Sequence, residues 1–465
     1  MTIFMHPDKE TSSRTFIGEA ETYKTGMAAI GVPAVRISVS SNSILSILYY
    51  TNFCYFCIPE NTTIMDKLFE QHDAYLGEVP MGYMRGQMRH INWNSRLIGI
   101  KGPKGVGKST LIQQYVRKTF GEGNRHALYC SADTGYFTQH TLVDTAARFV
   151  REGGTHLFID EIHKYENWSR ELKEIYDLYR DLHVVVSGSS LIRFNDGQAD
   201  LSRRLVEYEM PGLSFREYLW FETGLRLDPV TLDELLAEPS QFCMKVRKQV
   251  KPLEHFKNYL KAGYYPFYFE EKGVYENKVQ GVVNYVIDSE LTAHRGLEVG
   301  NTRKVKALLQ VLSQMVPFQV DISKISRNIG IQRPTTLKYM KNLEEAKLIR
   351  RLFADLESTS DLQKPDKILL DNPNLIYTLS YLKPEIGTVR ESYFCNQLAS
   401  SGHRVEYGGI TTGDFKIDRN IVIEVGGEDK GFSQVKGEEK GYVAADDIES
   451  AVFRKIPLWA FGFLY

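Results

Sequence analysis

Residues 102–110 decide the fold, and they read Gly102, Pro103, Lys104, Gly105, Val106, Gly107, Lys108, Ser109 and Thr110. The apolar run at residues 97–100 comes directly before them, and residues 110–119 carry Leu, Ile, Tyr and Val at helical spacing. A strand that delivers a Gly-rich turn to the start of a helix is the setting in which G-x-x-x-x-G-K-[ST] binds phosphate. The pattern therefore predicts a nucleoside triphosphate site rather than a Gly-rich turn of similar composition.

Each residue type in this loop has a chemical reason. The three glycines let the backbone turn so that successive N–H groups face phosphate oxygens, at the positive end of the following helix. Lys108 is expected to reach the β- and γ-phosphates as a point charge, and Ser109 to hold Mg²⁺ through its hydroxyl.

A second apolar strand, at residues 155–159, ends in Asp160 and Glu161. In a parallel α/β sheet this pair is placed to act as a Walker B element, with Asp160 supporting Mg²⁺ and Glu161 orienting the attacking water. Two acids at a strand end also favour the first turn of a following helix, which is the structural alternative here. The phosphate loop favours the catalytic interpretation.

Two further strands are expected, at residues 127–130 and 183–186. The second ends in a run of serines, where Ser189 could sense the γ-phosphate or fix the attacking water. The first of these strands lies between the phosphate loop and the two acids in the sequence. This order is that of the ATPase branch with an additional catalytic Glu, so it supports a catalytic role for Glu161.

With these motifs in hand, the chain resembles an AAA+-related ATPase of a prokaryotic group that carries a C-terminal nuclease-like domain. The matching residues are 102–110, 160–165, 188–190, 200–204, 212–218 and 263–266, and the likeness also runs through the C-terminus. The resemblance implies a P-loop NTPase parallel sheet, then a helical lid and winged helix, then a small α/β domain like a restriction endonuclease. It also implies that Arg203 or Arg204 completes the ATP site, whereas pairing with Glu207 and Glu209 is the structural alternative.

The domain boundaries follow from these patterns. We expect an N-terminal extension of doubtful order at 1–64, an ATPase domain at 65–215, a helical lid or linker at 216–300, a winged helix at 301–360 and the nuclease-like domain at 361–465. Met65 is a candidate natural start. The apolar stretch at 44–58 is short for a membrane span and has no basic flank suited to a signal peptide.

Composition is typical of a multidomain cytoplasmic protein. The chain has 465 residues, 43% of them hydrophobic, and a formal net charge of −1, so no whole-chain basic field indicates nucleic acid. Its five cysteines are odd in number and scattered, and Cys54 and Cys57 lack a second ligand pair, so we expect reduced, unliganded thiols rather than zinc.

Residues 304–352 predict three helices and a strand, an order that resembles a winged helix-turn-helix whose third helix can enter a DNA groove. The basic candidates for DNA contact are Arg327, Arg333, Lys338 and Lys341. Packing against another domain is the alternative, because Glu344 and Glu345 make the third helix less uniformly basic.

The last hundred residues resemble a PD-(D/E)xK nuclease, in which acids on a bent sheet hold Mg²⁺. Glu391 on a helix, Asp414 before a strand and Glu424 within the strand 421–426 are the candidate metal ligands. Gly426 stands at the position of the family's lysine, which puts DNA cleavage in doubt. Three side chains on a following helix could supply the missing cation or polar group, namely Lys430, Gln434 and Lys436. Residues 456–465 are expected to form a buried terminal strand.

These observations predict an ATP- and Mg²⁺-dependent ATPase whose nucleotide state controls its C-terminal half. The alternatives are an ATP-regulated DNA nuclease and a binding switch that holds ATP without hydrolysing it. Expected partners are ATP and, through the winged helix, DNA. Self-assembly is left open, and no membrane association is expected.

Overall fold

The computed structural model describes residues 64–192, 201–314, 321–354, 363–409 and 412–465. Nearly all of the predicted N-terminal extension, with Cys54 and Cys57, lies outside them. Residues 62–465 group into one compact unit, which is the part described below.

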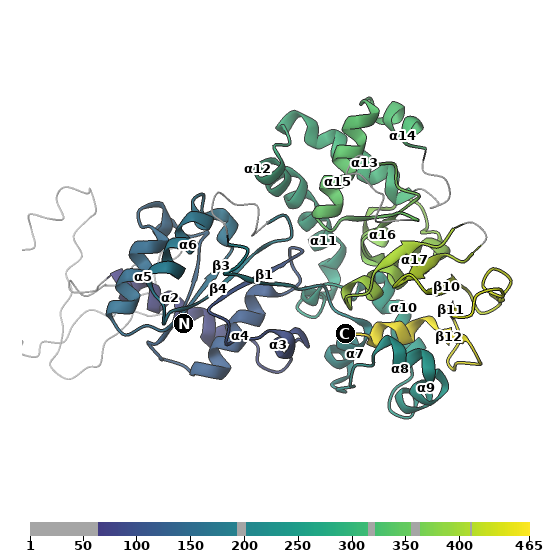
Figure 1. Cartoon of the computed structure of the whole chain (residues 1–465), viewed down its shortest axis with the longest axis horizontal. Coiled ribbons are helices and arrows are strands. Elements are labelled where there is room, and N and C mark those ends of the chain that lie inside the picture. The colour runs from purple at the N-terminus through teal and green to yellow at the C-terminus, as the bar shows by residue number, and fades with distance from the viewer. Residues whose placement is uncertain (1–63, 193–200, 315–320, 355–362, 410–411) are drawn as a thin grey trace, which may run out of the picture. The chain divides into compact units, whose positions relative to one another are not determined.

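The N-terminal part of this unit is built on a parallel five-stranded sheet with the order β2-β3-β4-β1-β5 (Figure 1). Its strands are β1 Leu97–Gly102, β2 Ala127–Ser131, β3 His156–Asp160, β4 His183–Ser189 and β5 Val206–Glu209. All four neighbouring pairs are parallel, as the expected α/β fold requires. This order sets β4 between β1 and β3, so the carboxyl ends of these three strands meet at one edge of the sheet.

The side chains of these strands alternate between two cores, since successive residues of a strand point to opposite faces. Ile98, Ile100 and Phe158 belong to the core that also takes up helix α4, whereas Leu157 and Ile159 belong to the core of helices α5 and α6. The helices of this part are α2 Ile64–Glu78, α3 Gln87–His90, α4 Lys108–Phe120, α5 Leu142–Arg151 and α6 Trp168–Leu178. Cover on both faces explains why the strands read as continuous apolar runs.

Helices fill the middle of the chain, where a lid or linker was predicted. They are α7 Phe215–Thr223, α8 Leu232–Ala237, α9 Pro239–Arg247, α10 Pro252–Ala262, α11 Tyr275–Tyr285 and α12 Leu291–Arg295. The break expected around Pro266 is the 3₁₀ helix Pro266–Tyr268. Phe215 of α7 packs edge-on against Phe463, and Phe256 of α10 against Tyr393, so these two helices pack on the C-terminal half rather than forming a separate lid.

The region predicted as a winged helix has three helices followed by a two-stranded antiparallel sheet. These elements are α13 Thr302–Gln314, α14 Ile322–Ile329, α15 Arg333–Glu345, β6 Ile349–Leu352 and β7 Lys367–Leu370. The predicted order of three helices and a strand is present, and we call α13–α15 the three-helix module. The predicted strand extends over residues 349–352 and pairs with β7, which the sequence analysis did not identify.

The C-terminal part holds a mixed sheet with the order β12-β11-β10-β9-β8, in which β9 pairs antiparallel with both β8 and β10. Its elements are α16 Pro373–Leu379, α17 Ile386–Ser400, β8 Val405–Tyr407, β9 Phe415–Ile417, β10 Ile421–Gly426, β11 Gly441–Ala445 and β12 Lys455–Pro457. The terminal strand predicted at 456–465 is wrong for most of its length. After β12 the chain forms the buried 3₁₀ helix Leu458–Phe463, whose Trp459 and Phe463 pack on the aromatic ring of Phe242.

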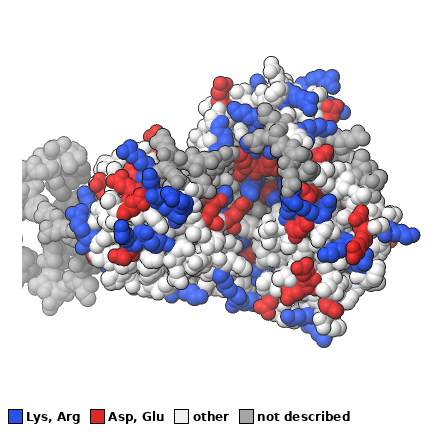
Figure 2. All heavy atoms as spheres, in the orientation of Figure 1, with Lys and Arg blue, Asp and Glu red and all other residues white. Residues whose placement is uncertain are grey.

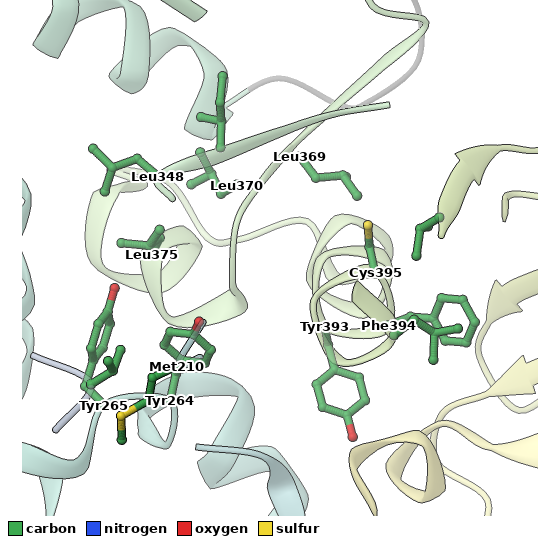
Figure 3. Packing of buried hydrophobic residues seen from close by; sticks show 14 of the residues in the cluster. Met210, Tyr264, Tyr265, Leu348, Leu369, Leu370, Leu375, Tyr393, Phe394 and Cys395 are labelled. Carbon is green, nitrogen blue, oxygen red and sulfur yellow. The ribbon is translucent and has the colours of Figure 1, made fainter. Parts of the chain in front are cut away.

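One apolar core runs from the first sheet into the C-terminal half. Figure 3 shows Met210, Tyr264 and Tyr265 near Leu375, with Tyr393, Phe394 and Cys395 along α17. Cys130, Cys243 and Cys395 are buried free thiols, as expected. Among the described residues, no helix is both long and apolar enough to cross a membrane.

Candidate functional site

The carboxyl edge of the parallel sheet gathers the predicted motifs. β1 leads into the loop 102–110, β3 ends at Asp160, and β4 ends at Ser189. We call this set, together with Glu161 and Ser187, the nucleotide-site candidate. Its members follow three adjacent parallel strands, so they lie at one edge of the sheet.

Glycine is required in the loop for two different reasons. A Cβ on Gly102 would lie 2.2 Å from the backbone oxygen of Met210, so the backbones approach too closely for any side chain. Gly105 and Gly107 have φ angles of 84° and 93°, in the left-handed region that L side chains rarely adopt. Val106 is fixed through its carbonyl, which accepts a 2.9 Å hydrogen bond from the buried guanidinium of Arg85.

Lys108 begins α4 and is buried, with 6% of its surface exposed. Its Nζ donates hydrogen bonds of 2.9 Å to the carbonyl oxygens of Gly102 and Pro103. Burial lowers the pKa of Lys108 from its usual value, while the nearby carboxylates of Glu161, Asp160 and Glu290 oppose that change. The ammonium thus lies inside the loop, where phosphate oxygens can replace the two carbonyls as acceptors.

Asp160 is buried and held by two hydroxyl donors. Tyr129 donates to Oδ2 at 2.9 Å, and Ser187 donates to Oδ1. Burial raises the pKa of the Tyr129 hydroxyl, and the nearby charge of Asp160 raises it further. The hydroxyl therefore stays protonated and can act as a donor. A carboxylate oxygen is the type of ligand that Mg²⁺ prefers, and two hydroxyl donors fix the orientation of this one.

Glu161 adopts the left-handed conformation at φ 52°, uncommon for a residue with a side chain. Burial raises the pKa of Glu161, the charge of Asp160 adds to the rise, and Lys108 opposes it. His163 lies beside it, with Nε2 3.4 Å from Glu161 Oε2. Burial lowers the pKa of His163 to about 3, so the ring is neutral at pH 7. Its Nδ1 accepts from the Ser189 N–H, which leaves Nε2 as the protonated nitrogen facing Glu161.

Ser189 makes a contact that the sequence analysis did not anticipate. Its hydroxyl donates to the carboxylate of Glu290, which is 4% exposed and ends the π-helix Val286–Glu290 between α11 and α12. Tyr285 also approaches the loop, since the ammonium of Lys104 lies 4.0 Å from its ring centroid. Residues 285–290 therefore reach the nucleotide-site candidate from the middle of the chain.

Arg203 and Arg204 are not brought to this edge. They come just before β5, and in a parallel sheet the start of a strand lies at the edge opposite the loop. Arg204 pairs with Asp177 near the end of α6, at 3.0 Å, and Arg203 is exposed. The predicted role in this chain's own ATP site is therefore not supported. Glu207 and Glu209, the alternative partners, pair with Lys101 and Lys347 instead.

The C-terminal candidates form a second buried centre, which we call the acidic cluster: Glu391, Asp414 and Glu424 with Lys367 and Lys430. Lys367 Nζ lies 2.8 Å from Glu391 Oε2 and 3.5 Å from Asp414 Oδ1. Burial raises the pKa of Glu391 to about 7, with Lys367 opposing the rise and Asp414 adding to it. Asp414 Oδ2 also accepts from the backbone N–H of Val425 at 2.9 Å.

Lys430 takes over the place that Gly426 leaves open. A Cβ built on Gly426 would lie 2.6 Å from Cγ of Lys430, whose ammonium pairs with Glu424 Oε1. The segment after β10 is a turn rather than the predicted helix. Within the described residues, no three or more His, Cys, Asp or Glu side chains are grouped so that they could hold a metal ion. The acids therefore do not form the predicted second metal site in this arrangement, because lysines occupy the space between them.

The basic residues predicted to contact DNA lie on α14 and α15. Arg327, Arg333 and Lys338 are exposed, whereas Leu337, Met340 and Leu343 bury the opposite side of α15. Figure 2 shows basic and acidic side chains interspersed over the visible face, which agrees with the net charge of −1. The exposed basic residues of α14 and α15 therefore form a narrow basic face, and the visible surface as a whole is not basic.

Several contacting residues were missed by sequence reasoning. Tyr129, Arg85 and Lys367 carry no local motif, and distant segments bring them to their partners. Glu290 also carries no local motif, because residues 284–290 include other polar side chains and nothing in the pattern marks this acid as buried.

Comparisons with known proteins agree with the first sheet. Residues 94–219 match a family described as an AAA domain, which covers β1 to α7, and residues 253–385 match a domain of unknown function. Residues 94–219 are thus similar to AAA domains, and the five-stranded parallel sheet fits a P-loop fold. No curated protein matches the chain.

Two solved structures align with it at low similarity. PCH-2 of C. elegans is 14% identical, with 61% of this chain and 67% of that chain covered and a TM-score of 0.20. AMPPCP-bound DnaA of Aquifex aeolicus is 16% identical, with 63% and 90% covered and a TM-score of 0.21. At these TM-scores neither alignment bears on function.

Proposed function

We propose that the chain is a Mg²⁺-dependent ATPase whose nucleotide state controls its C-terminal half. The observation that carries this proposal is Lys108, a buried ammonium that donates to two carbonyls of its own loop and lies near Asp160 and Glu161. A buried lysine with weak neutral acceptors has most to gain from a phosphate, whose charge-assisted hydrogen bonds are about twice as strong.

The roles follow from the contacts. The loop 102–110 cradles the phosphates with its N–H groups, and Lys108 moves from the carbonyls of Gly102 and Pro103 to the β- and γ-phosphates. Ser109 and Asp160 would hold Mg²⁺, which when bound neutralises charge on the transferring phosphoryl group. Tyr129 and Ser187 keep Asp160 in place.

Glu161 is the group that acts on water. Its raised pKa makes it a better proton acceptor than an exposed glutamate, and the neutral His163 restricts its orientation. Ser189 would donate to the γ-phosphate from the end of β4. Arg203 and Arg204 lie at the other edge of the sheet, so neither is assigned a role at this chain's own nucleotide-site candidate.

Phosphate release from ATP tests this proposal. We expect turnover in the wild type and a loss of about 100-fold or more in Glu161→Gln, which removes the base without changing shape. Glu166→Gln, an exposed acid in the same turn, is the matched control and should keep wild-type rates. Tight ATP binding without phosphate release in either protein would instead support the binding switch, and equal non-zero rates would contradict the role of Glu161.

The nuclease alternative is favoured by one observation, the ammonium of Lys430 on Glu424 at the place that Gly426 leaves open. Glu424 Oε2 is also buried without a hydrogen-bond partner. The present arrangement does not fit a metal ion, so the ion pairs of the acidic cluster must open before one could bind. Nicking of supercoiled DNA with Mg²⁺, lost in Asp414→Ala and Lys430→Met but not in the exposed Lys436→Met, would support this function; no nicking by the wild type would exclude it.

DNA contact by the three-helix module is a separate part of the proposal. The exposed Arg327, Arg333 and Lys338 would bind phosphates of the duplex, so binding should weaken as salt is raised. Replacing Arg333 and Lys338 together by Ala should abolish a mobility shift seen with wild type at low salt, and an unchanged shift would point to a purely structural module.

A further inference from the structure

The hydroxyl of Ser189 is already engaged at the place where a γ-phosphate would need it. It donates to the buried carboxylate of Glu290. A serine hydroxyl has a single proton to donate. A γ-phosphate oxygen at the end of β4 would therefore compete with Glu290 for the same donor.

Charge adds to this competition. Glu290 is 4% exposed, and its carboxylate is close enough to act on the pKa of both Lys108 and Glu161. Placing the charge of a γ-phosphate beside this carboxylate is unfavourable in a buried site, where the effective dielectric is low.

The backbone around Glu290 has the form of a movable element. Residues 286–290 form a π-helix between two α-helices, and such insertions are frequently found at functional sites. Tyr285 at its start lies over the ammonium of Lys104 in the loop.

Two ion pairs connect the π-helix and the following helix α12 to the three-helix module. Asp288 pairs with Lys306 of α13 at 2.6 Å, and Arg295 pairs with Glu345 of α15 at 2.5 Å. Arg295 also donates to the carbonyl of Leu191, just after β4, at 2.8 Å. Arg295 thus contacts the end of β4 and α15 at once.

Resting on the proposed function, we propose that Glu290 is a positioning residue that makes the site distinguish ATP from ADP and transmits the difference to the three-helix module. A bound γ-phosphate accepts the hydrogen bond of the Ser189 hydroxyl in place of Glu290, and its charge repels the Glu290 carboxylate. The π-helix then shifts, and with it the ion pairs of Asp288 and Arg295. ADP leaves the Ser189–Glu290 hydrogen bond in place.

The first test compares equilibrium affinities for ADP and a non-hydrolysable ATP analogue, both with Mg²⁺. Glu290→Gln removes the repulsion, so the ratio of the affinity for the analogue to the affinity for ADP should rise about tenfold. This change corresponds to about 1.4 kcal/mol. Glu276→Gln, an exposed acid on α11, is the matched control and should keep the wild-type ratio. A purely structural role of Glu290 would change both affinities together.

The second test is amide hydrogen exchange of residues 286–295. In the wild type the analogue should accelerate exchange relative to ADP, and in Glu290→Ala exchange should be fast with either nucleotide. A wild-type affinity ratio in Glu290→Gln, or exchange that is equal with both nucleotides in wild type, would overturn this inference while leaving the ATP site intact. Failure of the wild type to bind either nucleotide would instead overturn the proposed function itself.

Discussion

The nucleotide-site candidate and the acidic cluster both set lysines against buried carboxylates, but they satisfy these charges in opposite ways. In the first, neutral groups of the chain bind each charge: carbonyls hold Lys108, and hydroxyls hold Asp160. In the second, Lys367 and Lys430 bind the acids directly. A charge held by neutral groups still gains from an ionic ligand, whereas an internal ion pair must first be broken. The difference indicates that the first centre is ready for a ligand and the second is closed.

The largest expected effect is on the free energy of unfolding when a glycine of each centre is replaced by alanine. Gly102→Ala pushes a methyl group against the backbone oxygen of Met210, so we expect a loss of more than about 3 kcal/mol in the free energy of unfolding. Gly426→Ala meets Cβ, Cγ and Cδ of Lys430 at 2.6–2.7 Å, so the turn that carries Lys430 must shift, and we expect a smaller loss of about 2 kcal/mol.

Urea unfolding of the two variants measures both values. Gly281→Ala, which has open space around it within α11, is the control and should not destabilise the chain. Similar losses for Gly102→Ala and Gly426→Ala would show that the backbone around the nucleotide-site candidate is not more constrained than the acidic cluster.

The sequence predicted one centre far better than the other, for a physical reason. The loop 102–110 is contiguous, and its strand and helix are adjacent in the chain, so spacing alone places Lys108 and Ser109. Asp160 and Ser189 follow because parallel strands end at one edge. Lys367 comes from β7, an element without a strong local pattern, and Glu290 depends on a π-helix that periodicity does not reveal.

A second prediction uses the raised pKa of Glu391. Its pKa of about 7 in the folded chain lies above the usual 4.5, so the folded state holds the proton more tightly. Stability from this group is present below about pH 4.5 and is lost as pH rises to about 7. Relative to wild type, Glu391→Gln should therefore gain about 2 kcal/mol in the free energy of unfolding between these two pH values.

Thermal or urea unfolding of both proteins at several pH values measures this gain. Exposed Glu385 at the start of α17 offers a control, since Glu385→Gln should run parallel to wild type over the same range. A stability difference between Glu391→Gln and wild type that does not change with pH would contradict the raised pKa of Glu391 in the folded chain.

A smaller effect is expected from the hydroxyls around Asp160. Tyr129→Phe and Ser187→Ala each remove one hydrogen bond to this carboxylate, worth about 1.5 kcal/mol for a charged acceptor. Each should raise the Mg²⁺ concentration needed for half-maximal phosphate release about tenfold. An unchanged Mg²⁺ requirement in both variants would remove Asp160 from the metal's surroundings.

The smallest effect concerns the opposite edge of the sheet. Arg204→Ala breaks an ion pair with Asp177 that is partly exposed, so phosphate release by the chain itself should fall less than about twofold. A much larger loss that grows with protein concentration would show that Arg204 acts on the site of a second copy.

The most direct test of the central claim, that the loop 102–110 binds a triphosphate through Lys108, is calorimetric titration of the chain with ATP and Mg²⁺. The account predicts a saturable signal for the wild type and for Lys118→Met, an exposed lysine on the same helix. It predicts loss of that signal in Lys108→Met. Saturable binding that is equally strong in Lys108→Met, or its absence in the folded wild type, would contradict the account.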